Sequence, residues 1–474
     1  MKNLLTLPTC HPTWVIINHG LCKLLIAMKF LFAAKCFGPE VMGIVGLLLI
    51  LYAIVESLSE FGLIGAIVQA ERYPSESDLD SIWLALTLRG VVIGIIVFSI
   101  PTLTNYVTNT SETLVSALCL AVCALSKSMV SPNWYIALRE RNFKEIFFIT
   151  FLGVSFDFLI FVGLILLDVK FVAIFISLAA GEIIKLILTY LLFGTDRKLF
   201  IRFKSFNIDI KKYSNFGKWI WLNNIINLLL NQSDKLITGL ILGNASLGIY
   251  HMSNRLAQLG ISEFSMAYSK YLFPSFSRMN EKDVNNMTRF MTKSLSQISL
   301  LAFSSVIYMF SISSLLPILL GEEWKDGIIV LKILSITMAI GSLISVMVVY
   351  HRALGNPKLV TSAATIQLII FIPVLLALTY LYGVHGAASS TVISTAICFV
   401  FLIKNVPFDY SVLFSVYRSC LVPFIFFIIV VLISDVFDGY IIKTAISTFG
   451  FLIMLFSLVL GSRASETFYK FCRR

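Results

Sequence analysis

The chain alternates long apolar runs with short polar interruptions almost from end to end. Most runs hold about twenty residues, the length that an α-helix needs to cross the hydrocarbon core of a bilayer. A helix is expected there because no water is present to satisfy the backbone N–H and C=O groups. With Gly, Pro and charged residues taken as boundaries, the pattern predicts fourteen spans at approximately 13–36, 41–67, 81–104, 113–132, 146–167, 170–194, 216–241, 246–271, 296–320, 326–350, 359–381, 384–403, 412–433 and 441–461.

The composition agrees with an all-α polytopic membrane protein. Of the 474 residues 58% are hydrophobic and 13% are charged, and the mean hydropathy is +0.89. A soluble domain carries about a quarter charged residues. The eight cysteines lie mostly in apolar runs without the spacing of metal ligands, so we interpret them as packing residues and expect neither a metal site nor a cofactor.

The distribution of Lys and Arg predicts the orientation of the chain. One set of alternate connections, together with both termini, holds 25 of these residues, and the opposite set holds 4. Cytoplasmic connections carry the excess of positive charge, so both termini are predicted to be cytoplasmic. The net charge of +11 is then a signal of topology, and no nucleic-acid partner is expected.

A short pattern occurs twice, 205 residues apart: FGPEVMGI at 37–44 and LGNASLGI at 242–249. Each copy joins two predicted spans on the predicted outer side, and six spans separate the copies. Both copies therefore have the same orientation, as in parallel repeats related by an axis along the membrane normal. The alternative is that a glycine-rich tight turn recurs by chance.

Ionisable residues inside the predicted spans are unusual, because a charge at the bilayer centre costs about 2.5–3.5 kcal/mol. Such residues usually face the interior of a helix bundle or a wet cavity. They are concentrated early in each half of the chain. The first half contains Lys23, Lys29, Glu56, Glu60 and Arg89, and the second contains Asp234, Lys235, Arg255 and Glu263.

Two neighbouring predicted spans each have one polar face. Within an arc of about 100° on the span 246–271 lie His251, Asn254, Arg255, Gln258, Ser262, Ser265 and Ser269. Within about 120° on the span 216–241 lie Asn223, Asn224, Asn227, Asn231, Asp234, Lys235 and Thr238. Two wet faces predict a shared aqueous lumen. The alternative is that these side chains hydrogen-bond neighbouring helices.

The expected lumen is cationic on balance and should attract an anion. The guanidinium fork of Arg suits phosphate in particular, because it donates two parallel hydrogen bonds. The predicted substrate-binding residues are Lys23, Lys29, Arg89, Lys235, Arg255, His251, Asn254, Gln258, Asn227 and Asn231. The candidates for an acid that couples transport to an ion are Asp234, Glu56 and Glu60. Similar depths in the bilayer predict the ion pairs Lys23–Glu56 and Glu60–Arg89.

Several segments resemble bacterial Wzx-type flippases of polysaccharide repeat units, within the multidrug, oligosaccharidyl-lipid and polysaccharide exporter superfamily. They are residues 37–69, 231–259, 271–279, 321–334 and 351–359. The resemblance implies a transporter that is not an enzyme, with two pseudo-symmetric six-helix bundles around a central polar cavity. The expected parts are a first bundle at 1–194, a cytoplasmic linker at 195–215, a second bundle at 216–403, and two further helices with a cytoplasmic tail at 404–474.

The resemblance also implies a substrate, which is an oligosaccharide unit joined through pyrophosphate to undecaprenol. Such a unit moves by alternating access from the cytoplasmic to the periplasmic leaflet of the bacterial inner membrane. The partners implied are this lipid-linked oligosaccharide, membrane lipid, and the polysaccharide polymerase and chain-length machinery.

Three other functions stay open. A drug exporter of the same superfamily would be expected to have an acidic lumen, and a lipid II flippase also fits a basic one. A membrane-embedded polysaccharide polymerase or ligase would be an enzyme, and we would expect it to carry a large outer loop. All predicted outer loops here are short.

Overall fold

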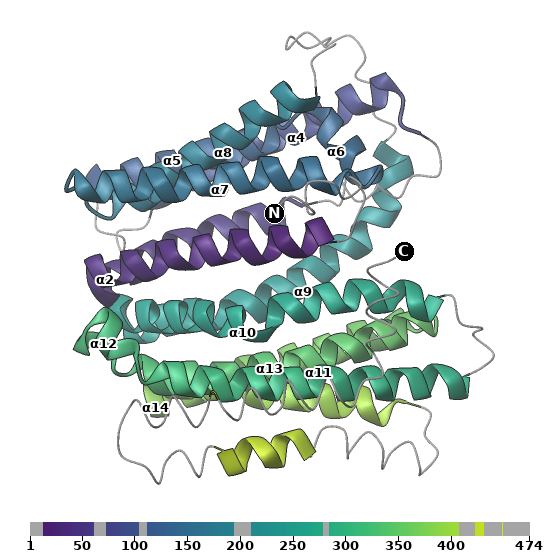
Figure 1. The fold of residues 1–474 in the computed structure, drawn as a ribbon. Coiled ribbons are helices and arrows are strands. Elements are labelled where there is room, and N and C mark those ends of the chain that lie inside the picture. The colour runs from purple at the N-terminus through teal and green to yellow at the C-terminus, as the bar shows by residue number, and fades with distance from the viewer. Residues whose placement is uncertain are drawn as a thin grey trace. The chain divides into compact units, whose positions relative to one another are not determined.

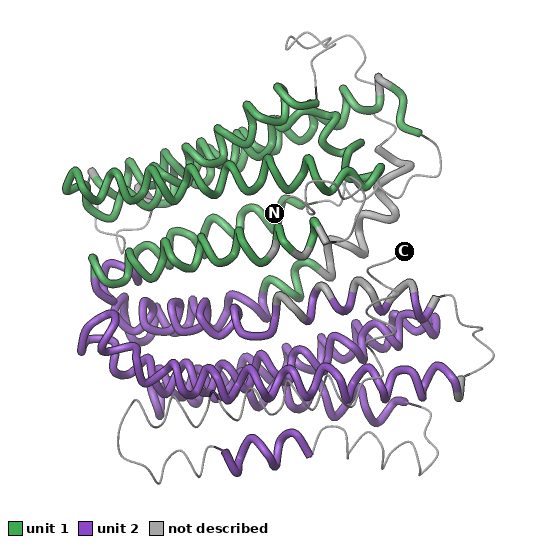
Figure 2. Tube along the Cα trace, in the orientation of Figure 1, with its two compact units in different colours: residues 1–37, 44–228 green, residues 38–43, 229–474 purple. Residues whose placement is uncertain are grey.

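The computed structural model describes residues 13–60, 73–103, 111–193, 210–277, 284–406, 422–430 and 448. Every regular element in these residues is a helix (Figure 1). They divide into two compact units, one of residues 1–37 and 44–228, the other of residues 38–43 and 229–474 (Figure 2). The short segment 38–43 thus belongs to the second unit, although the chain on both sides of it belongs to the first.

The first unit is built from helices that follow the predicted spans. In chain order they are α2 (Thr13–Leu58), α4 (Glu76–Leu103), α5 (Ser111–Ser128), α6 (Pro132–Arg139), α7 (Phe143–Leu166), α8 (Val172–Phe193) and the beginning of α9 (Ile210–Leu242). Helix α5 packs against both α4 and α8, and α8 packs against α7.

Small residues permit these close approaches. A Cβ atom at Gly181 of α8 would lie 2.8 Å from the Cβ of Asp157 and 2.9 Å from the carbonyl oxygen of Gly153, both on α7. Such contact between helix backbones is typical of helix packing in membranes, where apolar side chains are attracted as well by lipid as by protein.

The second unit is centred on α13. Besides the remainder of α9 it comprises α10 (Asn244–Ser277), α11 (Val284–Ser313), α12 (Leu316–Leu320), the 3-10 helix η2 (Glu322–Trp324), α13 (Gly327–Ala353) and α14 (Pro357–Lys404). Helix α13 packs against α10, α11 and α14. Its Tyr350 is fully buried, and the Tyr350 hydroxyl lies 2.9 Å from the Thr288 hydroxyl of α11.

Two helices are about twice as long as one crossing requires. Helix α2 has 46 residues and α14 has 48, against roughly 20 for one span. Each contains one glycine with non-helical torsion angles, Gly38 (φ 72°, ψ 175°) and Gly383 (φ 61°, ψ −139°). Glycine adopts a positive φ without steric cost, so each interrupts its helix where the sequence predicts the boundary between two spans.

Three predicted connections are helical in part. One is the predicted linker 195–215, whose residues 210–215 begin α9, while residues 195–209 lie outside the described parts. Helix α11 begins at Val284, twelve residues before the predicted start of its span at 296, because Met287, Met291, Leu295 and Ile298 form one buried stripe at helical spacing. The same predicted span, 296–320, is interrupted after Ser313, and Pro317 lies in the short α12 that follows. The predicted connection 133–145 contains most of α6, which is bent by 60° from α5.

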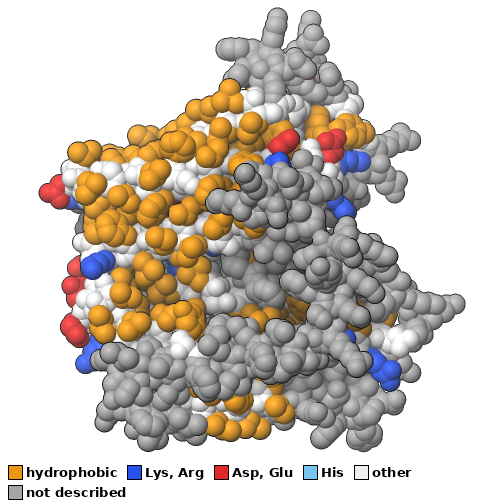
Figure 3. Space-filling view, viewed as in Figure 1, with side chains coloured by type: hydrophobic (Ala, Val, Ile, Leu, Met, Phe, Trp, Pro, Cys, Tyr) orange, Lys and Arg blue, Asp and Glu red, His pale blue; other side chains and the backbone are white. Residues whose placement is uncertain are grey.

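Seven of the described helices are long and apolar enough to cross a membrane, or eight if α5 and α6 form one bent span. Their apolar side chains remain widely exposed, and Figure 3 shows them along the helices, with charged groups near the helix ends on this face. Helices α9 and α10 are not among the seven, although they have 33 and 34 residues. The predicted total of fourteen spans stays a prediction, because nearly all of residues 441–461 and most of 412–433 lie outside the described parts.

The contact between α7 and α8 yields a stability prediction. Gly181→Ala should lower the free energy of unfolding by about 1–3 kcal/mol, because the new methyl group meets backbone and Cβ atoms that cannot yield. The control is Gly163→Ala on α7, where nothing lies within 4 Å of the new Cβ. Thermal unfolding of both variants in detergent measures the difference. Equal unfolding midpoints would show that α7 and α8 shift apart to accommodate the methyl group without loss of stability.

The orientation is tested with reporter fusions. A reporter active only in the periplasm should be silent after Arg474, because the excess of Lys and Arg predicts a cytoplasmic C-terminus. The same reporter inserted after Asp168, in the predicted outer connection between α7 and α8, should be active. An active reporter after Arg474 would mean that the span count or the orientation is wrong.

Candidate functional site

A polar cavity lies within the first unit, between α2, α4, α5 and α6. Its volume is about 230 Å³. Four of its lining residues carry charge: Glu56 and Glu60 at the end of α2, Arg89 on α4, and Lys127 on α5. The uncharged lining residues are Tyr52, Leu86, Ile93, Ala124, Ser128 and Tyr135. Two acids and two bases make this cavity neutral overall, whereas the sequence predicts a surplus of bases.

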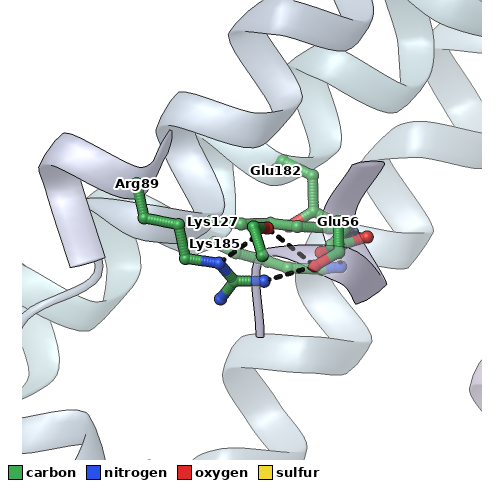
Figure 4. Close-up of polar contacts among 6 residues, drawn as sticks. Glu56, Arg89, Lys127, Glu182 and Lys185 are labelled. Atoms are coloured by element: carbon green, nitrogen blue, oxygen red, sulfur yellow. Dashed lines mark hydrogen bonds and ion pairs between the residues drawn. The ribbon is translucent and has the colours of Figure 1, made fainter. Parts of the chain in front are cut away.

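Arg89 is held in place by the end of α2 (Figure 4). Its Nε donates to Ser59 Oγ at 3.0 Å, and its Nη2 donates to the carbonyl oxygen of Glu56 at 2.7 Å. The last carbonyl groups of a helix have no donor within the helix, so Arg89 supplies one. Both acceptors are uncharged. These two hydrogen bonds use two of the five guanidinium N–H groups, and the other three have no acceptor among the described residues. Arg89 is thus a positioned cation whose charge no described carboxylate neutralises.

Glu56 is neutralised by Lys127. The Nζ of Lys127 lies 3.3 and 3.4 Å from the two carboxylate oxygens of Glu56, and it lies 5.0 Å from the centre of the Tyr52 ring. The predicted ion pair between Glu56 and Lys23 is therefore wrong, because the cation that pairs with Glu56 is Lys127. A common depth in the bilayer does not determine which helices are neighbours, and it is α5 that meets the end of α2 here.

Glu60 shares the cavity with Arg89, but the predicted ion pair between them does not form. The hydrogen bonds of Arg89 go to the main chain and to a serine, and the Glu60 side chain is exposed. Figure 4 also draws Glu182 and Lys185 of α8, which pair with each other at 2.8 Å. Their i, i+3 spacing in the sequence is the signal that could have identified this pair.

Lys29 does not face an aqueous space, contrary to its prediction as a substrate ligand. It is 1% exposed, and its Nζ donates to Asp157 Oδ1 on α7 at 2.5 Å and to the carbonyl oxygen of Ile174 at 3.1 Å. The Phe161 ring lies 5.5 Å from the same ammonium group. Asp157 stands alone in an apolar run, and its charge at membrane depth was the available signal that it has a partner.

The second unit places the polar faces of α9 and α10 next to each other. The Tyr250 hydroxyl of α10 donates to Asp234 Oδ2 of α9 at 2.7 Å, and both residues are buried. The Lys235 ammonium donates to the carbonyl oxygen of Asn231 and, at 3.3 Å, to Gln232 Oε1. Asp234 therefore joins the two helices, and the side-chain contacts of Lys235 are local to α9.

The polar stripe of α10 is satisfied in part by its own helix and by α13. Gln258 donates to Asn254 at 3.5 Å, and the hydroxyls of Ser265 and Ser345 lie 2.7 Å apart. Both ring nitrogens of His251 are buried and have no hydrogen-bond partner among the described residues. Arg255 is half-buried, and Lys23, Asn227 and Asn231 are exposed.

The structure thus brings the predicted residues together in two groups. Glu56, Glu60 and Arg89 share the cavity of the first unit. Asn231, Asp234 and Lys235 of α9 lie with Tyr250 of α10 in the second. The sequence reasoning missed four charged residues of the first unit, namely Lys127, Asp157, Glu182 and Lys185.

This architecture is that of a known class of multi-pass membrane transporters. The lipid II flippase MurJ in its inward closed conformation superimposes with a TM-score of 0.71, over 95% of this chain and 99% of that one, at 15% identity. An inward-facing multidrug resistance MATE family transporter of the MOP superfamily superimposes with a TM-score of 0.64, over 82% of this chain and 94% of that one, at 13% identity. At these identities the likeness establishes the fold alone.

Sequence comparison identifies the family. Residues 34–329 match the family described as polysaccharide biosynthesis protein, and the chain belongs to this family, which confirms the resemblance to Wzx-type proteins. Lipopolysaccharide biosynthesis protein WzxC of Escherichia coli K12 is 24% identical over 351 residues, which are 73% of this chain and 66% of WzxC. A putative O-antigen transporter of Shigella flexneri is 27% identical over 183 residues, 38% of this chain and 43% of that protein. The matches span less than two thirds of either relative's own length.

The buried ion pair yields a prediction. Asp157→Asn removes the carboxylate that neutralises Lys29 and should cost about 3–5 kcal/mol of stability. The double variant Lys29→Leu with Asp157→Leu should be more stable than either single variant, because no unbalanced charge is buried. The control is Glu112→Gln, which breaks the exposed pair with Lys170 and should cost about 0–1 kcal/mol.

Thermal unfolding and membrane abundance of Asp157→Asn, of the single variants Lys29→Leu and Asp157→Leu, of their double variant and of Glu112→Gln check this prediction. If the double variant lost as much stability as the two single variants together, Lys29 and Asp157 would contribute independently, and the pair would not be the stabilising element.

Proposed function

We propose that the chain is a flippase for undecaprenyl-pyrophosphate-linked oligosaccharide units, which it moves from the cytoplasmic to the periplasmic leaflet for surface polysaccharide biosynthesis. The observation that carries the proposal is the family match over residues 34–329, within a fold shared with transporters. The names of two relatives, a lipopolysaccharide biosynthesis protein and a putative O-antigen transporter, support the same class of substrate.

The polar groups of the described helices fit the parts of such a substrate. Sugar hydroxyls require hydrogen-bonding walls, which Asn231 of α9 and Asn254 and Gln258 of α10 supply. A pyrophosphate requires a cation with spare donors, and Arg89 has three. The polyprenyl chain needs no site of its own, because it can remain in the bilayer beside the exposed apolar side chains.

The geometry changes the roles that we propose for the charged residues. Lys29 is a structural residue, and Arg89 becomes the leading phosphate ligand of the first unit, with Lys23, Arg255, Lys235 and His251 kept as further ligands. Among the three candidate coupling acids, Asp234 is bound by Tyr250 and Glu56 by Lys127. We therefore propose the exposed Glu60 as the acid most accessible to a proton or sodium ion.

The test replaces Arg89 in cells that depend on this chain for surface polysaccharide. Arg89→Ala should reduce export at least about tenfold, because two charge-assisted hydrogen bonds of about 1.5–3 kcal/mol each can be lost. Arg89→Lys should restore export only in part, since it keeps the charge but not the fork. Lys170→Ala, at an exposed ion pair of the outer connection, should leave export unchanged.

Export is measured as surface polysaccharide per unit of membrane-inserted protein. Normal export by an abundant Arg89→Ala variant would remove Arg89 from the substrate path. A second assay separates the substrates: if the chain sustained growth of cells depleted of their lipid II flippase but did not export oligosaccharide units, the substrate assignment would be wrong.

A further inference from the structure

The two copies of the repeated pattern have the same backbone conformation. The first glycine of each copy adopts a positive φ, 72° at Gly38 and 85° at Gly243. L-residues with a side chain rarely adopt this conformation, so glycine is needed at both positions. The two copies therefore share a backbone conformation as well as a sequence pattern, which argues against a chance recurrence.

The second glycine of each copy packs directly on the backbone of the other copy. A Cβ atom at Gly43 would lie 1.8 Å from the carbonyl oxygen of Asn244, and one at Gly248 would lie 1.9 Å from the carbonyl oxygen of Pro39. Real Cβ atoms essentially never come within 3.0 Å of another heavy atom. Pro39 and Asn244 are separated by 205 residues, as are Gly43 and Gly248, so the two contacts are one contact made twice.

We call the contact between residues 38–43 and 244–248 the seam. Its two segments pack closely, but few strong interactions join them. Met42 and Leu247 are buried there, at 1% and 0% exposure. Among the described residues no hydrogen bond or ion pair joins the two segments. The contact consists of Cα groups against carbonyl oxygens, so it can part without breaking a strong bond.

The seam also occupies a particular place in the chain. Residues 38–43 belong to the second unit, whereas the chain that enters and leaves this turn belongs to the first unit. Any separation of the turn from α10 must therefore move the covalently attached helix segments of α2. The distribution of Lys and Arg predicts that both turns lie on the outer side.

We propose that this seam is the closed outer gate of the transport path, and that the four glycines are present because it must close tightly and still part. The proposal rests on the proposed transport function. Closing brings backbone to backbone and leaves no room for water, and opening costs only weak contacts. The repeat supplies both sides of the gate from one sequence pattern.

The test adds one methyl group to either side of the seam. Gly43→Ala or Gly248→Ala should hold the seam apart, because the new Cβ cannot remain within 2 Å of a carbonyl oxygen. The control is Gly341→Ala on α13 in the second unit, where nothing lies within 4 Å of the new Cβ. Asn254 lies six residues beyond Gly248 on α10 and is 5% exposed. A cysteine at this position reports whether a reagent added outside the cell can pass the seam.

Labelling is done on intact cells with a membrane-impermeant maleimide and read by mass spectrometry on the peptide that carries residue 254. We expect labelling to rise severalfold in either alanine variant. The double variant should show no further rise, because the first methyl group has already separated both contacts. Unchanged labelling in well-inserted Gly43→Ala and Gly248→Ala would overturn the gate, and so would an equal rise in Gly341→Ala.

A cross-link distinguishes a gate from a fixed pivot. Glu40 and Ala245 occupy equivalent positions of the two copies and are both exposed. Cysteines at these positions, joined by a flexible bismaleimide in a Cys36→Ser background, should abolish export, whereas the same variant without cross-linker should retain it. Export that persists after cross-linking would show that the seam does not open. The labelling result does not depend on the substrate, so a wrong substrate would leave it intact.

Discussion

The exclusion of water from the bilayer core governs this protein at every level. Backbone groups must find their partners within helices, and ionised side chains must find theirs within the bundle. Lys29 shows the second requirement most clearly, because a fully buried ammonium group is held by Asp157 and by the carbonyl oxygen of Ile174. These two partners come from α7 and from α8, so satisfying one charge connects three helices of the first unit.

Close packing within the units depends on residues that lack a side chain. Lipid attracts apolar side chains as well as protein does, so helices in a membrane gain most by letting their backbones approach. Gly181 of α8 does this against the backbone of α7, and Gly43 and Gly248 do it at the repeated turn. Glycine has a second use at Gly38 and Gly383, where a positive φ interrupts a helix that the apolar pattern would otherwise continue.

The charged residues fall into two groups, according to whether their neighbours neutralise the charge or only orient the side chain. Lys29, Glu56 and Asp234 are each bound by a partner from another helix, so they stabilise the bundle. Arg89 is different, because its acceptors are a carbonyl oxygen and a hydroxyl, which orient the guanidinium without neutralising it. A cation that is positioned but not neutralised in a cavity is suited to an anionic ligand. We propose that the same distinction separates residues that hold the helix bundle together from residues available to a substrate.

The sequence by itself determined the helical class, most span boundaries and the glycine turns, because helix formation in a bilayer depends on local apolar length and local punctuation. It also located the polar faces of α9 and α10, since helical periodicity assigns residues such as Asn254 and Gln258 to one side. It did not determine the partners of charges. Lys29 was expected to face water and Glu56 to meet Lys23, whereas the structure pairs them with Asp157 and Lys127.

Only the tertiary structure decided these pairings, and it likewise showed that the second glycine of each turn meets the carbonyl of the other turn. Both are contacts between segments far apart in the chain. Depth and periodicity constrain where a residue lies along and around its own helix, but the choice of neighbouring helix depends on packing that no local pattern contains.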